Sequence, residues 1–114
     1  MNPESIRALC LAWPGVTESI QWSEHLVLKV GGKIFAIVNL DGAGNAMSLK
    51  VDPEEFVELC EREGIIPAPY LARAKWVALE GFDVMSPKEL KARLRQSYDL
   101  VFAKLPKKIA RALG

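Results

Sequence analysis

The chain has 114 residues, of which 50% are hydrophobic and 25% are charged, and this length and composition predict one globular domain over residues 1–114 and exclude a disordered chain, a fibre and a second domain. The net charge of +1 hides an asymmetry, because residues 1–68 carry five basic and ten acidic side chains and residues 69–114 carry ten basic and four acidic. The two parts therefore carry net charges of −5 and +6. This asymmetry favours an anionic partner at the C-terminal part, although a solvated basic helix face gives the same net charge.

The first predicted element is a helix over residues 3–13. Asn2 is a favourable N-cap, Pro3 suits the first turn, and apolar side chains then recur at helical spacing until a Pro-Gly pair ends the pattern. Four strands are predicted next, over residues 19–22, 26–30, 33–40 and 47–51. Two adjacent glycines, Gly31 and Gly32, join the second strand to the third and are typical of a tight hairpin.

A second helix is predicted to begin after Asp52 and to end near Gly64. Asp52 is a good N-cap, and acidic residues follow at the positive end of the helix dipole. The next segment, residues 65–71, contains two prolines, which fix φ and remove backbone donors. We therefore expect an ordered loop that brings Tyr70 and Leu71 to the surface.

The last predicted elements are a strand over residues 75–79 and a long helix that begins after Ser86. An apolar stripe at helical spacing runs along this helix until Pro106 breaks or bends it, which leaves a short basic tail. The element order is α-β(4)-α-β-α. It predicts the α+β class, as a two-layer sandwich with a mainly antiparallel five-stranded sheet and the helices on one face.

Side-chain alternation along the strands assigns two faces to this sheet. On the helix-facing side the two-residue turn predicts three cross-strand pairs, Val30 with Lys33, Leu28 with Phe35 and Leu26 with Ile37. The opposite face is predicted to carry His25, Val27, Lys29, Ile34, Ala36, Val38, Ser48 and Lys50. Trp76 is also expected to point to this second face, which is then moderately apolar with two lysines and a tryptophan.

Three interpretations of this second face stay open. In the first, the lysine stems cover apolar surface while Trp76 packs under the loop formed by residues 67–71. In the second, the face binds an anion or a nucleic acid, because lysines contact phosphates and an aromatic ring stacks on a base. In the third, the face binds a protein.

Six segments of the chain resemble the MmcQ/YjbR family over nearly the whole length and in the family's order. They are Trp13-Pro14-Gly15-Val16, Lys29-Val30-Gly31-Gly32-Lys33-Ile34-Phe35-Ala36, Ser48-Leu49-Lys50, Pro67-Ala68-Pro69-Tyr70-Leu71, Lys75-Trp76-Val77 and Ser97-Tyr98. The resemblance implies a two-layer α+β fold akin to CyaY-like or secretion-chaperone-like domains, and a DNA-binding function. It also implies two wings, the hairpin around Gly31 and Gly32 and the loop over residues 41–45, although this second wing has no lysine or arginine.

The sequence offers no catalytic constellation. The single histidine, His25, has no dedicated nucleophile or carboxylate partner, and the glycine pairs lack the further residues of a dinucleotide or phosphate-binding loop. The glutamates of the second helix are spread around a solvated surface rather than gathered as metal ligands. We therefore expect no enzyme activity, no metal and no cofactor.

The compartment follows from the cysteines and from the N-terminus. Cys10 and Cys60 are expected to be separate buried thiols, as in a reducing cytoplasm. The N-terminus lacks the basic segment and apolar run of a signal peptide, and no stretch has the length of a membrane span. We expect a cytoplasmic monomer with no membrane partner.

The leading hypothesis is a non-catalytic nucleic-acid-binding domain. Lys29, Lys33 and Lys50 are expected to contact phosphates, and Trp76 to offer a stacking surface. Further attraction is expected from three cations of the last helix, Lys88, Lys91 and Arg95.

Two other functions stay open. A protein-interaction adaptor would use the same apolar face and depend on Trp76 or Ile34. A small-molecule sensor would use a pocket between residues 67–71 and the sheet, lined by Trp22, His25, Tyr70 and Trp76.

Overall fold

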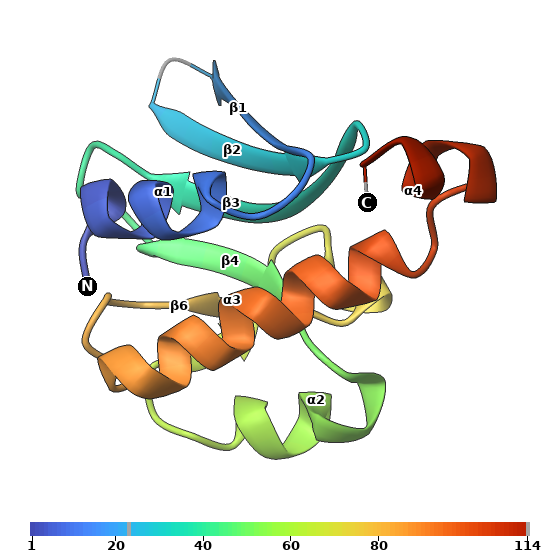
Figure 1. Ribbon diagram of the computed structural model, residues 1–114. Helices are drawn as coiled ribbons and strands as arrows, with labels where there is room; N and C mark the ends of the chain where they lie inside the picture. Colours follow the sequence, from blue (N-terminus) through green and yellow to red (C-terminus); the bar gives the residue numbers. More distant parts are fainter. Residues whose placement is uncertain (23, 114) are drawn as a thin grey trace.

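The computed structural model describes residues 1–22 and 24–113. The elements in chain order are α1 (Pro3–Leu11), β1 (Val16–Gln21), β2 (His25–Val30), β3 (Lys33–Asn39), β4 (Met47–Lys50), α2 (Pro53–Cys60), β5 (Ile65–Pro67), the short 3₁₀ helix η1 (Ala72–Ala74), β6 (Trp76–Leu79), α3 (Pro87–Phe102) and α4 (Lys107–Leu113). Within these residues the strands form one six-stranded antiparallel sheet, in the order β1-β2-β3-β4-β6-β5. Helices α1 and α3 cross the front of this sheet (Figure 1). The α+β class and the two-layer arrangement are confirmed.

Three helices begin at the predicted N-caps. The side chains of Asn2, Asp52 and Ser86 each accept a backbone N–H from two or three residues further on, at 2.8, 2.9 and 3.1 Å. Each cap satisfies a donor that the first helical turn would otherwise leave unpaired, and each is followed by a proline in that turn. In the described part of the chain, no helix is both long enough and apolar enough to cross a membrane.

The predicted number of strands was wrong. The described residues form six strands rather than five, because part of the segment predicted as a loop pairs with β6 as strand β5. Pro67 is tolerated there because β5 lies at the edge of the sheet, where a missing N–H costs no ladder hydrogen bond. At the opposite edge, β1 begins at Val16, three residues before the predicted start.

The predicted register of the central hairpin was also wrong beyond its first pair. The observed pairs are Val30 with Lys33, Lys29 with Ile34, Leu28 with Ala36 and Leu26 with Val38, with a β-bulge between Leu28 and Lys29. Phe35 is therefore an extra residue in β3. A bulge places two residues of one strand opposite one residue of its partner, and every pair after it is shifted.

The bulge decides which side chains of β3 face the helices. Phe35, Ala36 and Val38 are fully buried in the main core, whereas Ile34 and Ile37 belong to a smaller cluster on the other face. The prediction that Ala36 and Val38 lie on the free face was wrong, because the inserted residue reverses the alternation beyond it.

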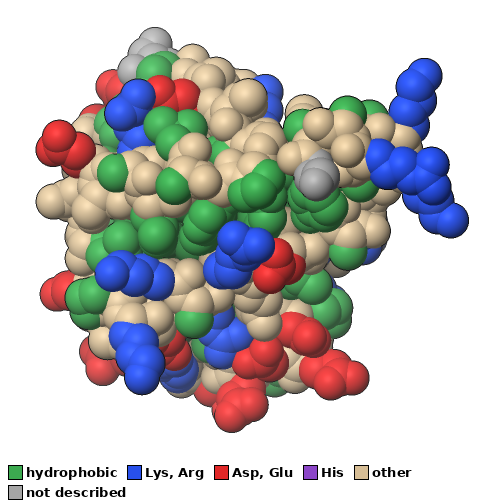
Figure 2. Space-filling view, in the orientation of Figure 1, with side chains coloured by type: hydrophobic (Ala, Val, Ile, Leu, Met, Phe, Trp, Pro, Cys, Tyr) green, Lys and Arg blue, Asp and Glu red, His purple; other side chains and the backbone are tan. Residues whose placement is uncertain are grey.

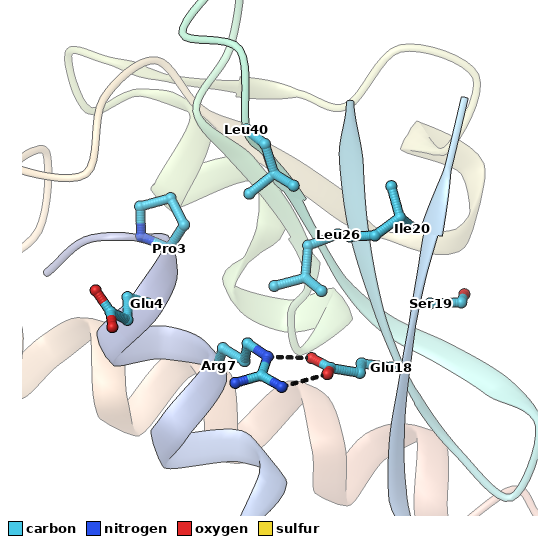
Figure 3. A pocket seen from close by; sticks show the side chains of 8 residues that line it. All are labelled: Pro3, Glu4, Arg7, Glu18, Ser19, Ile20, Leu26 and Leu40. Carbon is cyan, nitrogen blue, oxygen red and sulfur yellow. Dashed lines mark hydrogen bonds and ion pairs between the residues drawn. The ribbon is translucent and has the colours of Figure 1, made fainter. Parts of the chain in front are cut away.

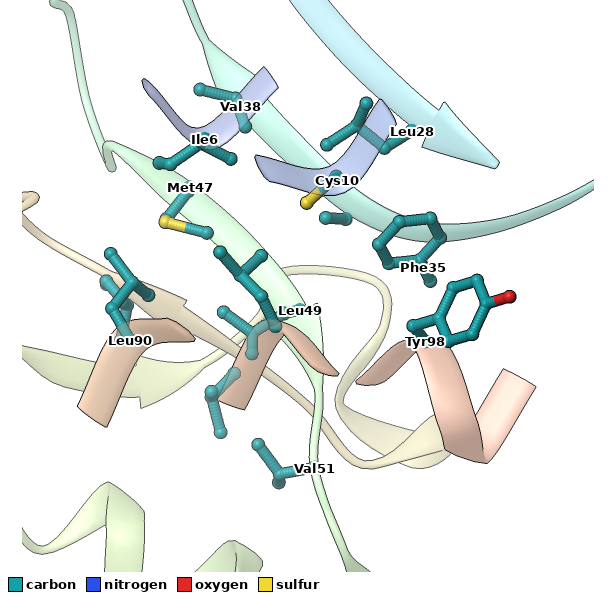
Figure 4. Close-up of a cluster of buried hydrophobic side chains, with 14 of the residues drawn as sticks. Ile6, Cys10, Leu28, Phe35, Val38, Met47, Leu49, Val51, Leu90 and Tyr98 are labelled. Atoms are coloured by element: carbon teal, nitrogen blue, oxygen red, sulfur yellow. The ribbon is translucent and has the colours of Figure 1, made fainter. Parts of the chain in front are cut away.

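The main core fills the space between the sheet and the helices. Figure 4 shows Ile6 and Cys10 of α1 and Leu90 and Tyr98 of α3 among the inward side chains of the strands. The hydroxyl of Ser97, on α3, donates to the carbonyl oxygen of Phe35 at 2.5 Å and accepts the N–H of Lys50 at 3.0 Å. This fully buried serine therefore joins α3 to the bulge and to the end of β4.

The second face of the sheet is partly covered. Ala68, Trp76 and Ala78 form a small buried cluster, with Ile37 and Leu71 packed against it. The segment between β5 and β6, which includes η1, supplies Ala68 and Leu71. This agrees with the interpretation in which Trp76 packs under the proline-containing segment.

Helix α4 packs beside the β2–β3 hairpin. A Cβ added to Gly31 would lie 2.7 Å from Leu105 and 3.1 Å from Ile109, and one added to Gly15 would lie 2.8 Å from Leu113. Gly31 has φ +58°, a conformation that favours glycine. The basic tail predicted after Pro106 is thus a helix, fixed close to the hairpin (Figure 1).

Candidate functional site

Lysines converge where the β2–β3 hairpin meets the end of α3. Lys33, Lys50 and Lys104 line one cavity of about 280 Å³, together with Ile34, Trp76 and Val101. Lys29 lies directly across from Ile34 in the hairpin. We call the surface formed by Lys29, Lys33, Lys50, Lys104 and the first two lysines of α4, Lys107 and Lys108, the basic end.

The lysines of the basic end take no part in the ion pairs found among the described residues. In the described part of the chain, none of these six lysines forms an ion pair with a carboxylate. Lys50 donates to the carbonyl oxygen of Ala74 at 2.5 Å, and its partial burial, together with the positive charge of Lys104, lowers its pKa. An anion at this point would lie beside several ammonium groups that no carboxylate of the described residues pairs with.

Trp76 does not provide the predicted stacking surface. It points away from the main core, as the alternation predicted, and its edge lines the lysine cavity. Its side chain is nevertheless only 6% exposed, because Ala68 and Leu71 pack over it. A nucleic-acid base has no ring face to stack on here.

The three cations predicted on the last helix lie apart from the hairpin lysines. Lys88, Lys91 and Arg95 belong to α3, which covers the opposite face of the sheet. Arg95 is also engaged, since it pairs with Asp99 at 3.2 Å and its guanidinium lies over two aromatic rings, 5.2 Å from that of Trp13 and 4.8 Å from that of Tyr98. The predicted nucleic-acid residues thus form two groups rather than one surface.

Two groups of like charge stand out on the helix-covered face of the molecule, although charges of both signs are mixed over the rest of it. Figure 2 shows basic side chains projecting from α4 at the right and acidic side chains gathered over α2 at the bottom. The two turns implied as wings are separated as well, because they lie at opposite ends of β3, roughly 20 Å apart at 3.3 Å per residue. The loop over residues 41–45 therefore does not extend the basic end.

A larger cavity lies at the other end of the second face, and we call it the aromatic pocket. It has a volume of about 680 Å³ and is lined by Trp22, His25, Ile37, Asn39, Asp41, Ala43, Asn45, Met47, Ser48, Pro69, Tyr70 and Leu71. Three of the four residues predicted for a ligand pocket, Trp22, His25 and Tyr70, therefore share one cavity. The fourth, Trp76, lines the lysine cavity instead.

The aromatic pocket contains two unusual features. Its rings are held by left-handed backbone, with φ +54° at Trp22 and +66° at Tyr70, although Trp22 is 65% exposed and Tyr70 is fully exposed. The ring of His25 lies edge-on to that of Trp22, with centroids 5.8 Å apart. The Nδ1 atom of His25 is buried, and no described residue offers it a hydrogen bond.

A third cavity, which the sequence did not indicate, lies between α1 and the strands near the β1 edge. It has a volume of about 460 Å³, and Figure 3 shows Leu26, Leu40 and Ile20 around it. Arg7 closes one side with a two-pronged ion pair to Glu18, at 2.5 Å for each contact. These two charges neutralise each other, whereas Glu4, which also lines the cavity, adds a carboxylate to it. No group of three or more metal-ligating side chains occurs among the described residues.

Comparisons with known proteins agree with this architecture. A family model described as YjbR matches residues 11–100. The crystal structure of the Deinococcus radiodurans protein DR2400, with the family-model domain DUF419, is similar with a TM-score of 0.86 and 29% identity, over 99% of this chain and 88% of that chain. A Pseudomonas syringae protein of known structure is similar in fold, with a TM-score of 0.69 and 19% identity over 88% of this chain and 98% of that chain. A comparison with curated proteins gives no match.

Proposed function

The chain belongs to the YjbR family, and on that premise we propose that it is a non-catalytic domain whose basic end binds the phosphate backbone of a nucleic acid. The observation that carries this proposal is the convergence of Lys33, Lys50 and Lys104 on one cavity, where none of them pairs with a carboxylate of the described residues. DNA is the nucleic acid that the family resemblance implies. The two free thiols are in keeping with the cytoplasm, which we propose as the compartment.

Lysines without counter-ions favour phosphate for an electrostatic reason. Each phosphate that they neutralise releases condensed counter-ions from the nucleic acid, and this release supplies most of the affinity of non-specific binding. The pKa of Lys50 is lowered because its ammonium is partly desolvated and lies near the positive charge of Lys104. The negative charge of a bound phosphate would offset both effects, because it stabilises the charged form of Lys50.

The same surface argues against recognition of individual bases. Trp76 is covered, and the cavity at the basic end is lined by lysines and apolar side chains. Contacts to phosphates position a nucleic acid without reading its sequence. We therefore expect similar affinities for unrelated sequences, with dissociation constants of roughly 1–100 µM and a strong dependence on salt.

Fluorescence anisotropy with labelled single- and double-stranded oligonucleotides tests the proposal. The variant is Lys33→Ala/Lys104→Ala, and its matched control is Lys88→Ala/Lys91→Ala, which removes the same charge from exposed positions on α3. We expect the first pair to lower affinity about tenfold at low salt and to reduce the slope of log K against log salt by about two, because each lysine accounts for about one phosphate.

The control pair should lower affinity less than threefold. If both variants are folded by circular dichroism and lose the same affinity, the basic end is not the binding site. If the unsubstituted protein does not bind oligonucleotides at low salt, the proposed nucleic-acid-binding function is wrong.

A further inference from the structure

The aromatic pocket is separate from the basic end and differs from it in charge. Among the described residues that line it, Asp41 is the only one that carries a full charge, and no lysine or arginine is present. Hydrogen bonding with Glu24 and with the backbone N–H of Ala43 holds the pKa of Asp41 below its usual range, and the contact with Asp41 raises the pKa of Glu24. Asp41 is thus ionised at neutral pH. The pocket favours a cation over an anion.

Two polar side chains of the pocket, Asn39 and Asp41, already have hydrogen-bond partners. The side-chain amide of Asn39 donates to the carbonyl oxygens of Ala43 and Asn45, and its oxygen accepts the N–H of Asp41 at 3.0 Å. Besides the carboxylate of Asp41 and the buried Nδ1 of His25, the polar side chains of Asn45, Ser48 and Tyr70 also line the pocket. An unpartnered buried nitrogen costs about 1–3 kcal/mol, and in the tautomer that carries its proton on Nε2 a ligand that donates a hydrogen bond to Nδ1 would recover this cost.

The two aromatic residues of the pocket, Trp22 and Tyr70, have strained backbone conformations. A left-handed conformation costs a bulky L-residue roughly 1–2 kcal/mol, and Trp22 and Tyr70 both adopt it while exposing their rings to water. Strained backbone of this kind gathers at ligand sites. Ring faces carry partial negative charge and attract organic cations, most strongly when a carboxylate is close.

We propose that the aromatic pocket binds a guanidinium group, which stacks on the rings of Trp22 and Tyr70 and donates hydrogen bonds to the Asp41 carboxylate and to Nδ1 of His25. A guanidinium is flat, permanently charged and rich in N–H donors, so it can meet the rings, the carboxylate and the nitrogen together. A quaternary ammonium would meet the rings but leave Nδ1 unpaired. The pocket volume, about 680 Å³, lies within the range of small-molecule sites.

Tryptophan fluorescence gives a direct test, because Trp22 is the exposed tryptophan, whereas Trp13 is half-buried against the main core and Trp76 is buried. The probe is N-ethylguanidinium, with N-ethylurea as an uncharged analogue of the same shape and tetramethylammonium as a cation without N–H groups. We expect N-ethylguanidinium to quench the emission with saturation, and the other two compounds to bind at least tenfold more weakly. Equal binding of N-ethylurea would overturn the proposal.

Substitution of the carboxylate provides the second arm. Asp41→Asn retains an oxygen that can accept the N–H of Ala43, so the turn is preserved. It should weaken N-ethylguanidinium binding at least tenfold by calorimetry, whereas Glu58→Gln, at an exposed position on α2, should leave it unchanged. Tyr70→Ala, which removes a fully exposed ring, should weaken binding several-fold without loss of folding. Unchanged affinity in both pocket variants would also overturn the proposal.

The guanidinium could belong to a free small molecule or to an arginine side chain. Acetyl-arginine amide, used beside N-ethylguanidinium, distinguishes these sources. Comparable affinity for the two supports an arginine within a peptide, and rejection of the amide supports a free guanidino compound. Neither probe contains phosphate, so these results do not depend on whether the basic end binds nucleic acid.

Discussion

At the scale of single residues, Ser97 explains how the β-bulge is tolerated. Its hydroxyl satisfies the carbonyl of Phe35, the inserted residue, and the N–H of Lys50, the last residue of β4. The geometry of the basic end therefore depends on a buried serine of α3.

We predict that Ser97→Ala destabilises the protein by about 2–4 kcal/mol, since it leaves a buried donor and a buried acceptor without partners. Urea unfolding measures the loss. The control is Ser86→Ala, which removes an exposed N-cap and should cost only about 1 kcal/mol. If Ser97→Ala cost no more than this control, the bridge would have no structural role.

Cys10 leads to a prediction about alkaline pH. Burial raises the pKa of its thiol from 9.0 to about 12 in the folded protein. The folded state therefore holds this proton more tightly than the unfolded state, so stability is complete below pH 9 and falls as the pH rises toward 12.

The expected slope from Cys10 is about 1.4 kcal/mol per pH unit above 9. Urea unfolding at pH 8, 9 and 10 should show it as a difference between the unsubstituted protein and Cys10→Ala. The variant is less stable at pH 8 because of its cavity, but should lose less stability on alkalinisation. Identical alkaline slopes would show that the thiol ionises freely in the folded state.

At the scale of elements, the sequence predicted the helix caps and the hairpin turn correctly, but not the register between the strands. The caps Asn2, Asp52 and Ser86 and the turn at Gly31 act within a few residues, and the structure confirms them. The bulge depends on Ser97, which lies 62 residues from the carbonyl that it satisfies. No local pattern contains that contact, so the register could not be read from the hairpin sequence alone.

The two glycines of the hairpin should respond differently to substitution. Both have positive φ, but a Cβ at Gly32 meets nothing within 4 Å, whereas one at Gly31 lies 2.7 Å from Leu105. Gly32→Ala should cost about 1–2 kcal/mol from backbone strain alone. Gly31→Ala should cost about 2–4 kcal/mol, because Leu105 must also move.

Thermal or urea unfolding gives both values, and hydrogen exchange in α4 gives a local readout. We expect faster exchange in α4 only for Gly31→Ala, since Leu105 and Ile109 fix that helix against the hairpin. Equal effects of the two substitutions would contradict the packing of α4 described above.

At the scale of the whole molecule, the basic side chains gather at one end, but they do not come only from the C-terminal part of the sequence. Lys33 of the acidic N-terminal part lies with Lys104 of the basic C-terminal part around one cavity. The sequence indicated the hairpin lysines, whereas Lys104 was missed. Its position before Pro106 placed it near the end of a helix, but only the docking of α4 brings that end to the hairpin.

The most direct test of the basic end is a ¹H–¹⁵N NMR titration of the protein with a single-stranded oligonucleotide at low salt. We predict that shifts concentrate in residues 29–34, at Lys50 and in residues 104–108, and that α2 and the first turns of α3 stay unchanged. Shifts centred on Lys88 and Lys91, or no shifts at protein concentrations well above 100 µM, would contradict the account.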